Sequence, residues 1–292
     1  MIEGDNMWIA DDWIDYKLID TSCGEKLERW GKYTLIRPDP QVIWKGDRTH
    51  DLWKNADASY KRVGGGGSWN KNDLPENWTI KYKDLTFKIA PSGFKHTGLF
   101  PEQAANWDWF SSLIKNENRP IKVLNLFAYT GAATIAAAKA GASVVHVDSS
   151  KGMVQRAKEN AALSGISDAP IRYIVDDCKK FVEREIRRQN KYDAVIMDPP
   201  SYGRGPNGEV WKLEDNVDDL VSTVSKILSD NPLFFLLNSY TTGLSPLAMR
   251  YIVELRLPKN NRTIEAEELG LRTQVGSHIL PCGSSVRVTY KF

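Results

Sequence analysis

Residues 123–148, VLNLFAYTGAATIAAAKAGASVVHVD, decide the fold of this chain. The first five residues form a short apolar run, which is typical of a buried parallel strand. Residues 132–140 are rich in alanine and are followed by Gly141, a pattern that predicts a helix with a glycine end. Residues 144–148 predict a second buried strand. A strand, a helix and a second strand form a right-handed βαβ unit, so the turn at residues 129–131 should lie at the carboxyl edge of a parallel α/β sheet.

That edge is where open α/β sheets bind ligands. Gly131 places no Cβ beside a ligand, and the helix that follows offers free N–H groups. Asp148 comes roughly 20 residues after the turn, where a carboxylate can accept from both hydroxyls of a ribose. A dinucleotide fold needs glycine at the two positions held here by Phe127 and Tyr129, so a pyrophosphate would be crowded. The pattern favours a nucleoside without phosphate, such as S-adenosylmethionine.

Two motifs carry a family resemblance. Residues 125–131, NLFAYTG, and residues 198–202, DPPSY, resemble motifs I and IV of class I S-adenosylmethionine-dependent methyltransferases. Within that superfamily, the sequences of these motifs are most similar to those of bacterial 23S ribosomal RNA methyltransferases with an L-F-x-Y-T-G loop. The resemblance implies a Rossmann-like seven-stranded sheet of order 3-2-1-4-5-7-6. Short strand-like pieces that alternate with turn residues over residues 1–75 predict a smaller N-terminal β-rich domain. We therefore expect an accessory domain over residues 1–97 and a methyltransferase domain over residues 98–292.

The resemblance also implies a set of cofactor contacts. Asp177 would accept a hydrogen bond from the adenine amino group, and the Cys178 backbone N–H would donate to a ring nitrogen. The alternative role for Asp176 and Asp177 is to cap the helix that starts at Lys179. Asn125 stands where many relatives have an acid, and we expect it to hold the turn by hydrogen bonds. The full expected set is Phe100, Gln103, Asn125, Phe127, Ala128, Tyr129, Thr130, Gly131, Asp148, Ser149, Asp177, Cys178 and Asp198.

The predicted catalytic residues are Asp198, Pro199 and Tyr202. Two prolines end the strand at residues 192–198. They hold Asp198 and the Pro199 carbonyl as hydrogen-bond acceptors at the rim of the site, which is the carboxyl edge of the sheet. Such a rim can orient a substrate amine while Tyr202 stacks on a planar ring, which is catalysis by positioning. Residues 201–212 lack periodicity and predict a loop, either a substrate lid or a connector.

The position after the predicted fifth strand helps to choose the methylated atom. Methylation of a pyrimidine at carbon 5 requires a cysteine nucleophile. Relatives with that chemistry carry cysteine after this strand, where residues 237–240 here read LNSY. We therefore expect methylation of a base nitrogen, a guanine of 23S ribosomal RNA. Alternatives are cytosine-5 methylation of RNA with Cys282 folding to the site, methylation of a protein or small molecule, and a binding factor that has lost catalysis.

Composition limits the remaining functions. The 292 residues carry a net charge of +2, so an RNA contact must come from a local patch. No run reaches the ~20 apolar residues of a membrane span and no secretion signal begins the chain, so we expect a cytoplasmic protein without membrane contact. The three cysteines have no metal-ligand spacing, and we expect no metal. The oligomeric state, monomer or homodimer, stays open.

The N-terminal part is unusual in its aromatic residues. Nine of the ten tryptophans precede residue 110. They can build the core of a small β-rich domain or stack on unpaired bases. Residues 60–71, YKRVGGGGSWNK, contain four glycines between basic and aromatic side chains, and we expect no regular structure there. This tract would be a linker or a clamp on single-stranded nucleic acid.

Overall fold

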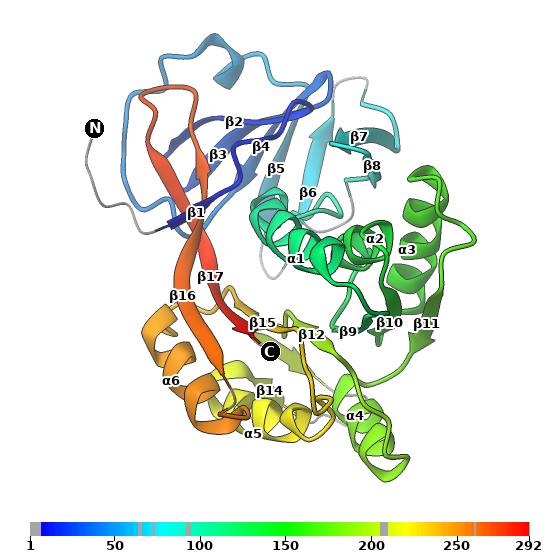
Figure 1. Cartoon of the computed structure of the whole chain (residues 1–292). Coiled ribbons are helices and arrows are strands. Elements are labelled where there is room, and N and C mark those ends of the chain that lie inside the picture. Colours follow the sequence, from blue (N-terminus) through cyan, green and yellow to red (C-terminus); the bar gives the residue numbers. More distant parts are fainter. Residues whose placement is uncertain are drawn as a thin grey trace. The chain divides into compact units, whose positions relative to one another are not determined.

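The structure is a computed structural model that describes residues 7–63, 66–71, 74–91, 95–204, 210–259 and 261–291 (Figure 1). The chain divides into two compact units. Unit 1 comprises Met1–Met7, Asn106–Glu268 and Gly283–Phe292, and unit 2 comprises Trp8–Ala105 and Leu269–Cys282. The functional division into residues 1–97 and 98–292 stays a prediction. Within the described residues, no helix is long and apolar enough to cross a membrane.

An eight-stranded sheet forms the centre of unit 1. In sheet order its strands are β1 (Met7–Ile9), β16 (Arg262–Arg272), β17 (Ile279–Tyr290), β15 (Phe234–Ser239), β12 (Ala194–Met197), β9 (Lys122–Leu126), β10 (Ser143–Asp148) and β11 (Ile171–Val175). The five strands from β15 to β11 are parallel, and β17 is antiparallel to β15. The predicted order 3-2-1-4-5-7-6 is confirmed, with β1 as an additional strand beside β16. Strands β16 and β17 each continue from unit 1 into unit 2.

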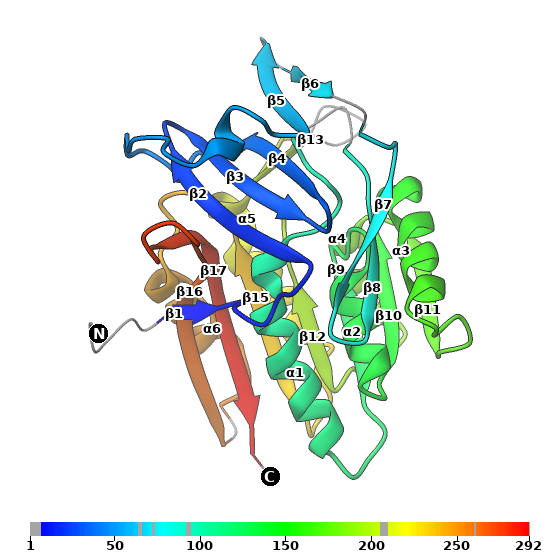
Figure 2. The same cartoon turned by 90° about the horizontal axis from the view of Figure 1, so that it is seen from above.

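Helices cover both faces of this sheet, as Figures 1 and 2 show. Helices α1 (Ala104–Asn116), α2 (Ala132–Lys139) and α3 (Lys151–Leu163) lie on one face. Helices α4 (Cys178–Arg187), α5 (Leu213–Ser225) and α6 (Pro246–Arg256) lie on the other. Central strand residues such as Leu124, Val195 and Phe235 are fully buried. Because strands of a parallel sheet are covered on both faces, they read as the continuous apolar runs seen in the sequence.

Unit 2 contains the β-rich part of the chain. Its five-stranded sheet is β2 (Tyr16–Ser22), β3 (Glu25–Trp30), β4 (Tyr33–Pro38), β5 (Ala58–Val63) and β6 (Gly66–Lys71). A separate hairpin joins β7 (Trp78–Tyr82) to β8 (Leu85–Ile89). The short helices η1 (Asp51–Trp53) and η2 (Pro101–Gln103) complete the unit. Trp30 is fully buried with its ring centroid 4.8 Å from that of Tyr16, which confirms that some tryptophans build the core.

Two expectations of irregular structure are wrong. The glycine tract enters strand β6, which pairs with β5 from Val63 opposite Gly66 to Ala58 opposite Lys71. Cross-strand hydrogen bonds and the contact between the Tyr60 and Trp69 rings, 5.5 Å apart, offset the entropy that the glycines lose. Likewise, residues 201–212 contain a hairpin of β13 (Tyr202–Arg204) and β14 (Val210–Lys212). Residues 64–65 and 205–209 lie outside the described part of the chain.

Candidate active site at the carboxyl edge of the sheet

The strand register brings the predicted acids of unit 1 to one edge. Val147 of β10 and Met197 of β12 both lie opposite Leu126 of β9. Asp148 lies opposite Val175, the last residue of β11. Asp148, which ends β10, and Asp177 and Asp198, which follow β11 and β12, therefore lie at the same edge of the sheet as the turn after β9. This is the edge at which the sequence places the site.

The turn after β9 has an unusual backbone. Phe127, Tyr129 and Gly131 all have positive φ angles, of 56°, 50° and 84°. Positive φ costs a non-glycine residue about 1 kcal/mol or more, so the surrounding structure must hold Phe127 and Tyr129 in place. Such strain is typical of ligand sites.

Two hydrogen bonds hold these strained residues. The Tyr129 N–H donates to Oδ2 of Asp148 at 2.8 Å, and the Phe127 N–H donates to Sγ of Cys178 at 3.2 Å. Asp148 ends β10 and Cys178 begins α4, so both acceptors bind the turn to segments beside it. Asp148 and Cys178 consequently shape the turn in addition to their predicted contacts with a ligand.

The position of Gly131 has a packing reason. A Cβ built on Gly131 would lie 2.7 Å from the Cβ of Ala157 in α3, and its φ of 84° already favours glycine. The sequence interpretation assigned this space to an approaching ligand. In the structure, the missing side chain lets α3 approach the turn, so glycine is required here even without a ligand.

A buried hydrogen-bond chain supports the turn from within. Asn125 Nδ2 donates to Oγ1 of Thr134 at 2.9 Å, and Thr134 Oγ1 lies 2.9 Å from Nδ1 of His146. All three side chains are at most 2% exposed. The Nδ2 of Asn160 in α3 donates to the Thr130 carbonyl at 2.9 Å. Asn125 thus makes a hydrogen bond to α2, the helix that follows the turn, and its role in holding the turn itself stays a prediction.

Sequence reasoning missed Thr134, His146, Ala157 and Asn160. Burial lowers the pKa of His146 to about 4, so its imidazole is neutral at neutral pH. Asn160 left a signal in the sequence, because it is a polar residue on the same face of its helix as the buried Val154 and Ala157. A histidine within the apolar run of β10 was a similar signal.

The end of β10 carries the predicted ribose acceptor. Asp148 is half-buried and also accepts from the Ser150 N–H through Oδ1 at 2.8 Å. Each carboxylate oxygen has about two lone pairs, so one backbone N–H per oxygen leaves capacity for two ribose hydroxyls. The next residue, Ser149, is exposed. These groups fit a ribose without any change of the backbone hydrogen bonds.

Asp177 and Cys178 begin α4. Asp177 is exposed and caps the helix, since its Oδ1 accepts from the Lys180 N–H at 2.8 Å. Helix capping, the alternative role for this acid, is therefore observed, and the adenine contact stays a prediction. The thiol of Cys178 is buried, and burial raises its pKa to about 12.

The Asp198–Pro–Pro segment ends β12. Asp198 is half-buried, Pro199 is buried, and Tyr202 in β13 is 53% exposed. Trp211 donates from Nε1 to the Pro200 carbonyl at 2.7 Å, so the hairpin β13–β14 is fastened to this segment. Tyr202 is therefore accessible near the end of β12, as its predicted stacking role requires.

Two predicted cofactor contacts belong to unit 2. Phe100 precedes η2, and its carbonyl accepts from the Gln103 N–H at 3.1 Å. Gln103 is 7% exposed. Their place beside a cofactor stays a prediction. Among the described residues, no group of three or more His, Cys, Asp or Glu side chains could hold a metal ion.

Comparisons with known proteins agree with this architecture. Residues 44–210, more than half of the chain, match the S-adenosylmethionine-dependent methyltransferase family. A crystal structure of the SAM-dependent methyltransferase from Agrobacterium tumefaciens is 36% identical, with a TM-score of 0.92 over 98% of this chain and 93% of that one. A protein described as a methyltransferase, in complex with SAH, has a TM-score of 0.75 at 18% identity and covers 96% of this chain and 76% of its own. The latter likeness shows the fold alone.

The curated relatives are longer proteins. Ribosomal RNA large subunit methyltransferase K/L of Shewanella frigidimarina is 34% identical over 147 residues, which are 50% of this chain and 20% of the relative. The corresponding protein of Shewanella baltica strain OS155 is 33% identical over 150 residues, 49% of this chain and 20% of the relative. The match thus spans about a fifth of the length of these relatives. Together with the family match and the near full-length structural relative, the strand order and the acid-lined edge lead to one conclusion: the chain belongs to the S-adenosylmethionine-dependent methyltransferase family.

Proposed function

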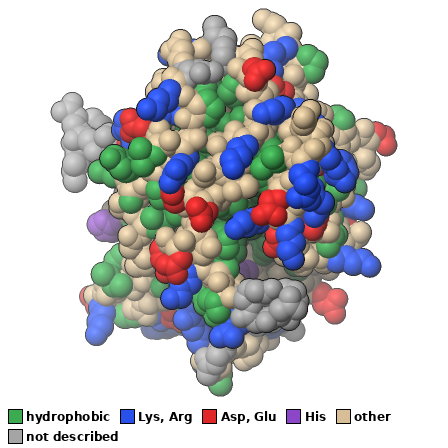
Figure 3. Space-filling view, turned by 90° about the horizontal axis from the view of Figure 1, so that it is seen from below, with side chains coloured by type: hydrophobic (Ala, Val, Ile, Leu, Met, Phe, Trp, Pro, Cys, Tyr) green, Lys and Arg blue, Asp and Glu red, His purple; other side chains and the backbone are tan. Residues whose placement is uncertain are grey.

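We propose that this chain transfers a methyl group from S-adenosylmethionine to a base nitrogen of RNA, a guanine of the large-subunit ribosomal RNA. The observation that carries the proposal is the 34% identity to a ribosomal RNA large subunit methyltransferase over half of this chain. The exposed Tyr202 beside Asp198 and Pro199 supports a planar acceptor. The small net charge of +2 requires a local RNA contact. On the face shown in Figure 3, Lys and Arg side chains alternate with acidic ones instead of forming one basic field.

The chain offers groups that suit each part of the cofactor. Asp148 would accept from the ribose hydroxyls with its remaining lone pairs, and Asp177 would accept from the adenine amino group. When bound, S-adenosylmethionine supplies a methyl group on a sulfonium, which is already a strong electrophile. The enzyme therefore needs alignment of the acceptor more than a strong base.

Asp198 and the Pro199 carbonyl would orient the acceptor. A substrate amino group can donate to both, which turns the nitrogen lone pair toward the methyl carbon. Tyr202 would hold the plane of the base by stacking. When the new N–C bond forms and the S–C bond breaks, the amine has one proton too many, and the Asp198 carboxylate would accept it.

The cysteines favour nitrogen over carbon 5. Carbon-5 chemistry begins with attack by a thiolate on the pyrimidine ring. Burial raises the pKa of Cys178 to about 12 and raises that of Cys282 well above the usual value of a thiol. Cys23, the third cysteine, is exposed in the turn between β2 and β3. A thiolate at Cys178 or Cys282 is thus disfavoured at neutral pH.

The test uses cofactor labelled with tritium in the methyl group. The protein is incubated with ribosomal RNA lacking its own modifications, with total protein and with a small-molecule extract. We expect label in RNA, in a methylated guanine after nuclease digestion. Asp198→Ala should bind the cofactor within about twofold of wild type by calorimetry and lose most of the transfer. Label only in protein or in small molecules would overturn the RNA proposal, and label at carbon 5 would overturn the choice of atom.

A further inference from the structure

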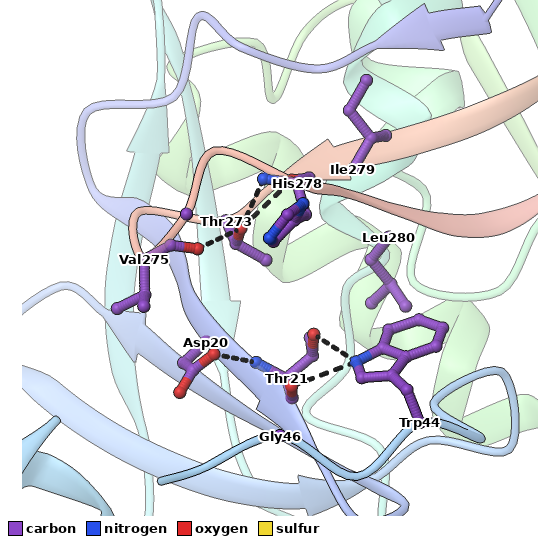
Figure 4. Close-up of a pocket in the computed structure, with 10 residues that line it drawn as sticks. Asp20, Thr21, Trp44, Gly46, Thr273, Val275, His278, Ile279 and Leu280 are labelled. Atoms are coloured by element: carbon purple, nitrogen blue, oxygen red, sulfur yellow. Dashed lines mark hydrogen bonds between the residues drawn. The ribbon is translucent and has the colours of Figure 1, made fainter. Parts of the chain in front are cut away.

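Unit 2 contains a cavity of about 440 Å³ that the methyl-transfer site in unit 1 does not use. Its walls come from the end of β2, from the segment after β4 that carries Trp44, and from the turn between β16 and β17 that carries His278. Figure 4 shows these side chains around the opening. The volume lies within the range of about 300–1,000 Å³ that small-ligand sites occupy.

Trp44 is held in a fixed orientation on one wall. Its indole Nε1 donates to the carbonyl and to Oγ1 of Thr21, at 3.1 and 3.2 Å. Its own carbonyl accepts from the Cys23 N–H at 3.0 Å. Yet the residue is 39% exposed, and of the ten tryptophans, all of which the structure describes, Trp44 alone is exposed. An ordered but accessible indole is what a stacking contact needs, because little conformational freedom is lost on binding.

His278 lies on another wall of the cavity, in the turn between β16 and β17, and the conformation of this turn fixes its position. A Cβ on Gly276 would lie 2.7 Å from Nε2 of His278, and Gly276 has a φ of 73°. The His278 N–H donates to Oγ1 of Thr273 at 3.0 Å, and this hydroxyl donates to the Val275 carbonyl at 2.7 Å. The glycine therefore allows the imidazole to lie over the turn, where it lines the cavity.

The remaining lining has few groups for a charged ligand. Val275, Ile279 and Leu280 add apolar surface. The carboxylate of Asp20 already accepts from the Thr21 N–H and from Nε1 of Trp53, each at 2.8 Å. A cavity with a fixed indole, an imidazole and apolar walls suits a flat, uncharged heteroaromatic ring. Lys45, the residue after Trp44, is exposed and does not line the cavity, so its ammonium group is available to a phosphate.

We propose that this cavity receives one unpaired base of the RNA substrate, which stacks on Trp44. The proposal rests on the proposed RNA methyltransferase activity and adds a second contact in unit 2, distinct from the base that is methylated. Sequence-specific recognition of RNA commonly splays out unpaired bases and stacks them on aromatic side chains. In this arrangement unit 2 selects the RNA while unit 1 transfers the methyl group.

The test compares Trp44→Ala, Trp44→Phe and the control Ile43→Ala. Ile43 is the neighbouring residue, is 85% exposed and does not line the cavity. Loss of one base stack weakens binding by about 1–3 kcal/mol, so we expect RNA affinity to fall about 5- to 150-fold in Trp44→Ala. Trp44→Phe should retain most of the affinity and Ile43→Ala all of it. Cofactor affinity, measured by calorimetry, should stay unchanged in all three, which also checks that each variant is folded.

A second measurement locates the base directly. RNA carrying 4-thiouridine at unpaired positions is irradiated on the protein, and the crosslinked peptides are identified by mass spectrometry. We expect crosslinks to the peptides with Trp44 or His278. If wild-type protein methylates RNA while Trp44→Ala binds it equally well and crosslinks map elsewhere, this inference is wrong and the proposed function stands. If wild-type protein neither binds nor methylates RNA, both are wrong.

Discussion

Gly131→Ala tests why the turn after β9 has its observed form. The new Cβ would lie 2.7 Å from the Cβ of Ala157 and 3.2 Å from its Cα, at a φ of 84°. Left-handed backbone costs an L-residue about 1–2 kcal/mol. Insertion of a methyl group into a packed contact costs about 1–3 kcal/mol. We therefore expect Gly131→Ala to lower the free energy of unfolding by about 3 kcal/mol, of which about half comes from the contact with α3.

A double-mutant cycle separates these two contributions. Ala157→Gly removes the atom that the new Cβ meets and by itself should cost about 1 kcal/mol of helix propensity. If the close approach is real, Gly131→Ala with Ala157→Gly should be about 1–2 kcal/mol more stable than the sum of the two single changes. Urea unfolding followed by near-UV circular dichroism measures all four proteins. Additivity within about 0.5 kcal/mol would refute the packing argument and leave only the backbone conformation.

Three further outcomes follow from the site. Asp148→Ala should weaken cofactor binding at least about tenfold, because hydrogen bonds to a charged acceptor contribute about 1.5–3 kcal/mol each, and equal affinities by calorimetry would remove Asp148 from the site. Iodoacetamide on the native protein at pH 8 should label Cys23 well before the buried Cys178 and the half-buried Cys282, whose thiol pKa values are raised by desolvation; mass spectrometry that finds equal rates would contradict the argument for nitrogen methylation. Because burial lowers the folded pKa of His146 to about 4 from 6.5, the unfolded state gains a proton first as the pH falls, and stability should decline between pH 6.5 and 4 by up to about 3 kcal/mol. His146→Gln should show a smaller decline over this window in urea titrations, and an identical decline would assign it to other groups.

Local patterns in the sequence were sufficient to predict the βαβ unit and the edge of the sheet that carries the acids. The apolar runs of β9 and β10 and the alanine-rich helix between them have periods that depend only on neighbouring residues. The strand order, by contrast, came from the family resemblance. Parallel pairing joins residues far apart in the chain, so its register, such as Met197 opposite Leu126, has no local signal.

Pairing between neighbouring strands explains where the predictions of irregular structure failed. Glycine has a poor intrinsic tendency to form a strand, yet β6, which begins with Gly66 and Gly67, forms because β5 pairs with it along its whole length. The aperiodic segment after Pro200 similarly gains a hairpin, which Trp211 fastens by its hydrogen bond to the Pro200 carbonyl. In both cases hydrogen-bonded pairing within a hairpin outweighs the intrinsic propensity of the residues.

The sequence by itself determined the α/β fold class, the sheet edge that carries Asp148, Asp177 and Asp198, and the glycine turn at residues 129–131. Only the tertiary structure decided what that glycine contacts, how Asn125 reaches His146 through Thr134, and that Trp44 and His278 line one cavity. The physical reason is the separation along the chain over which each kind of interaction acts. Chain periodicity and turn chemistry act over a few residues, whereas close packing and buried hydrogen bonds join side chains that the sequence separates by tens to hundreds of positions.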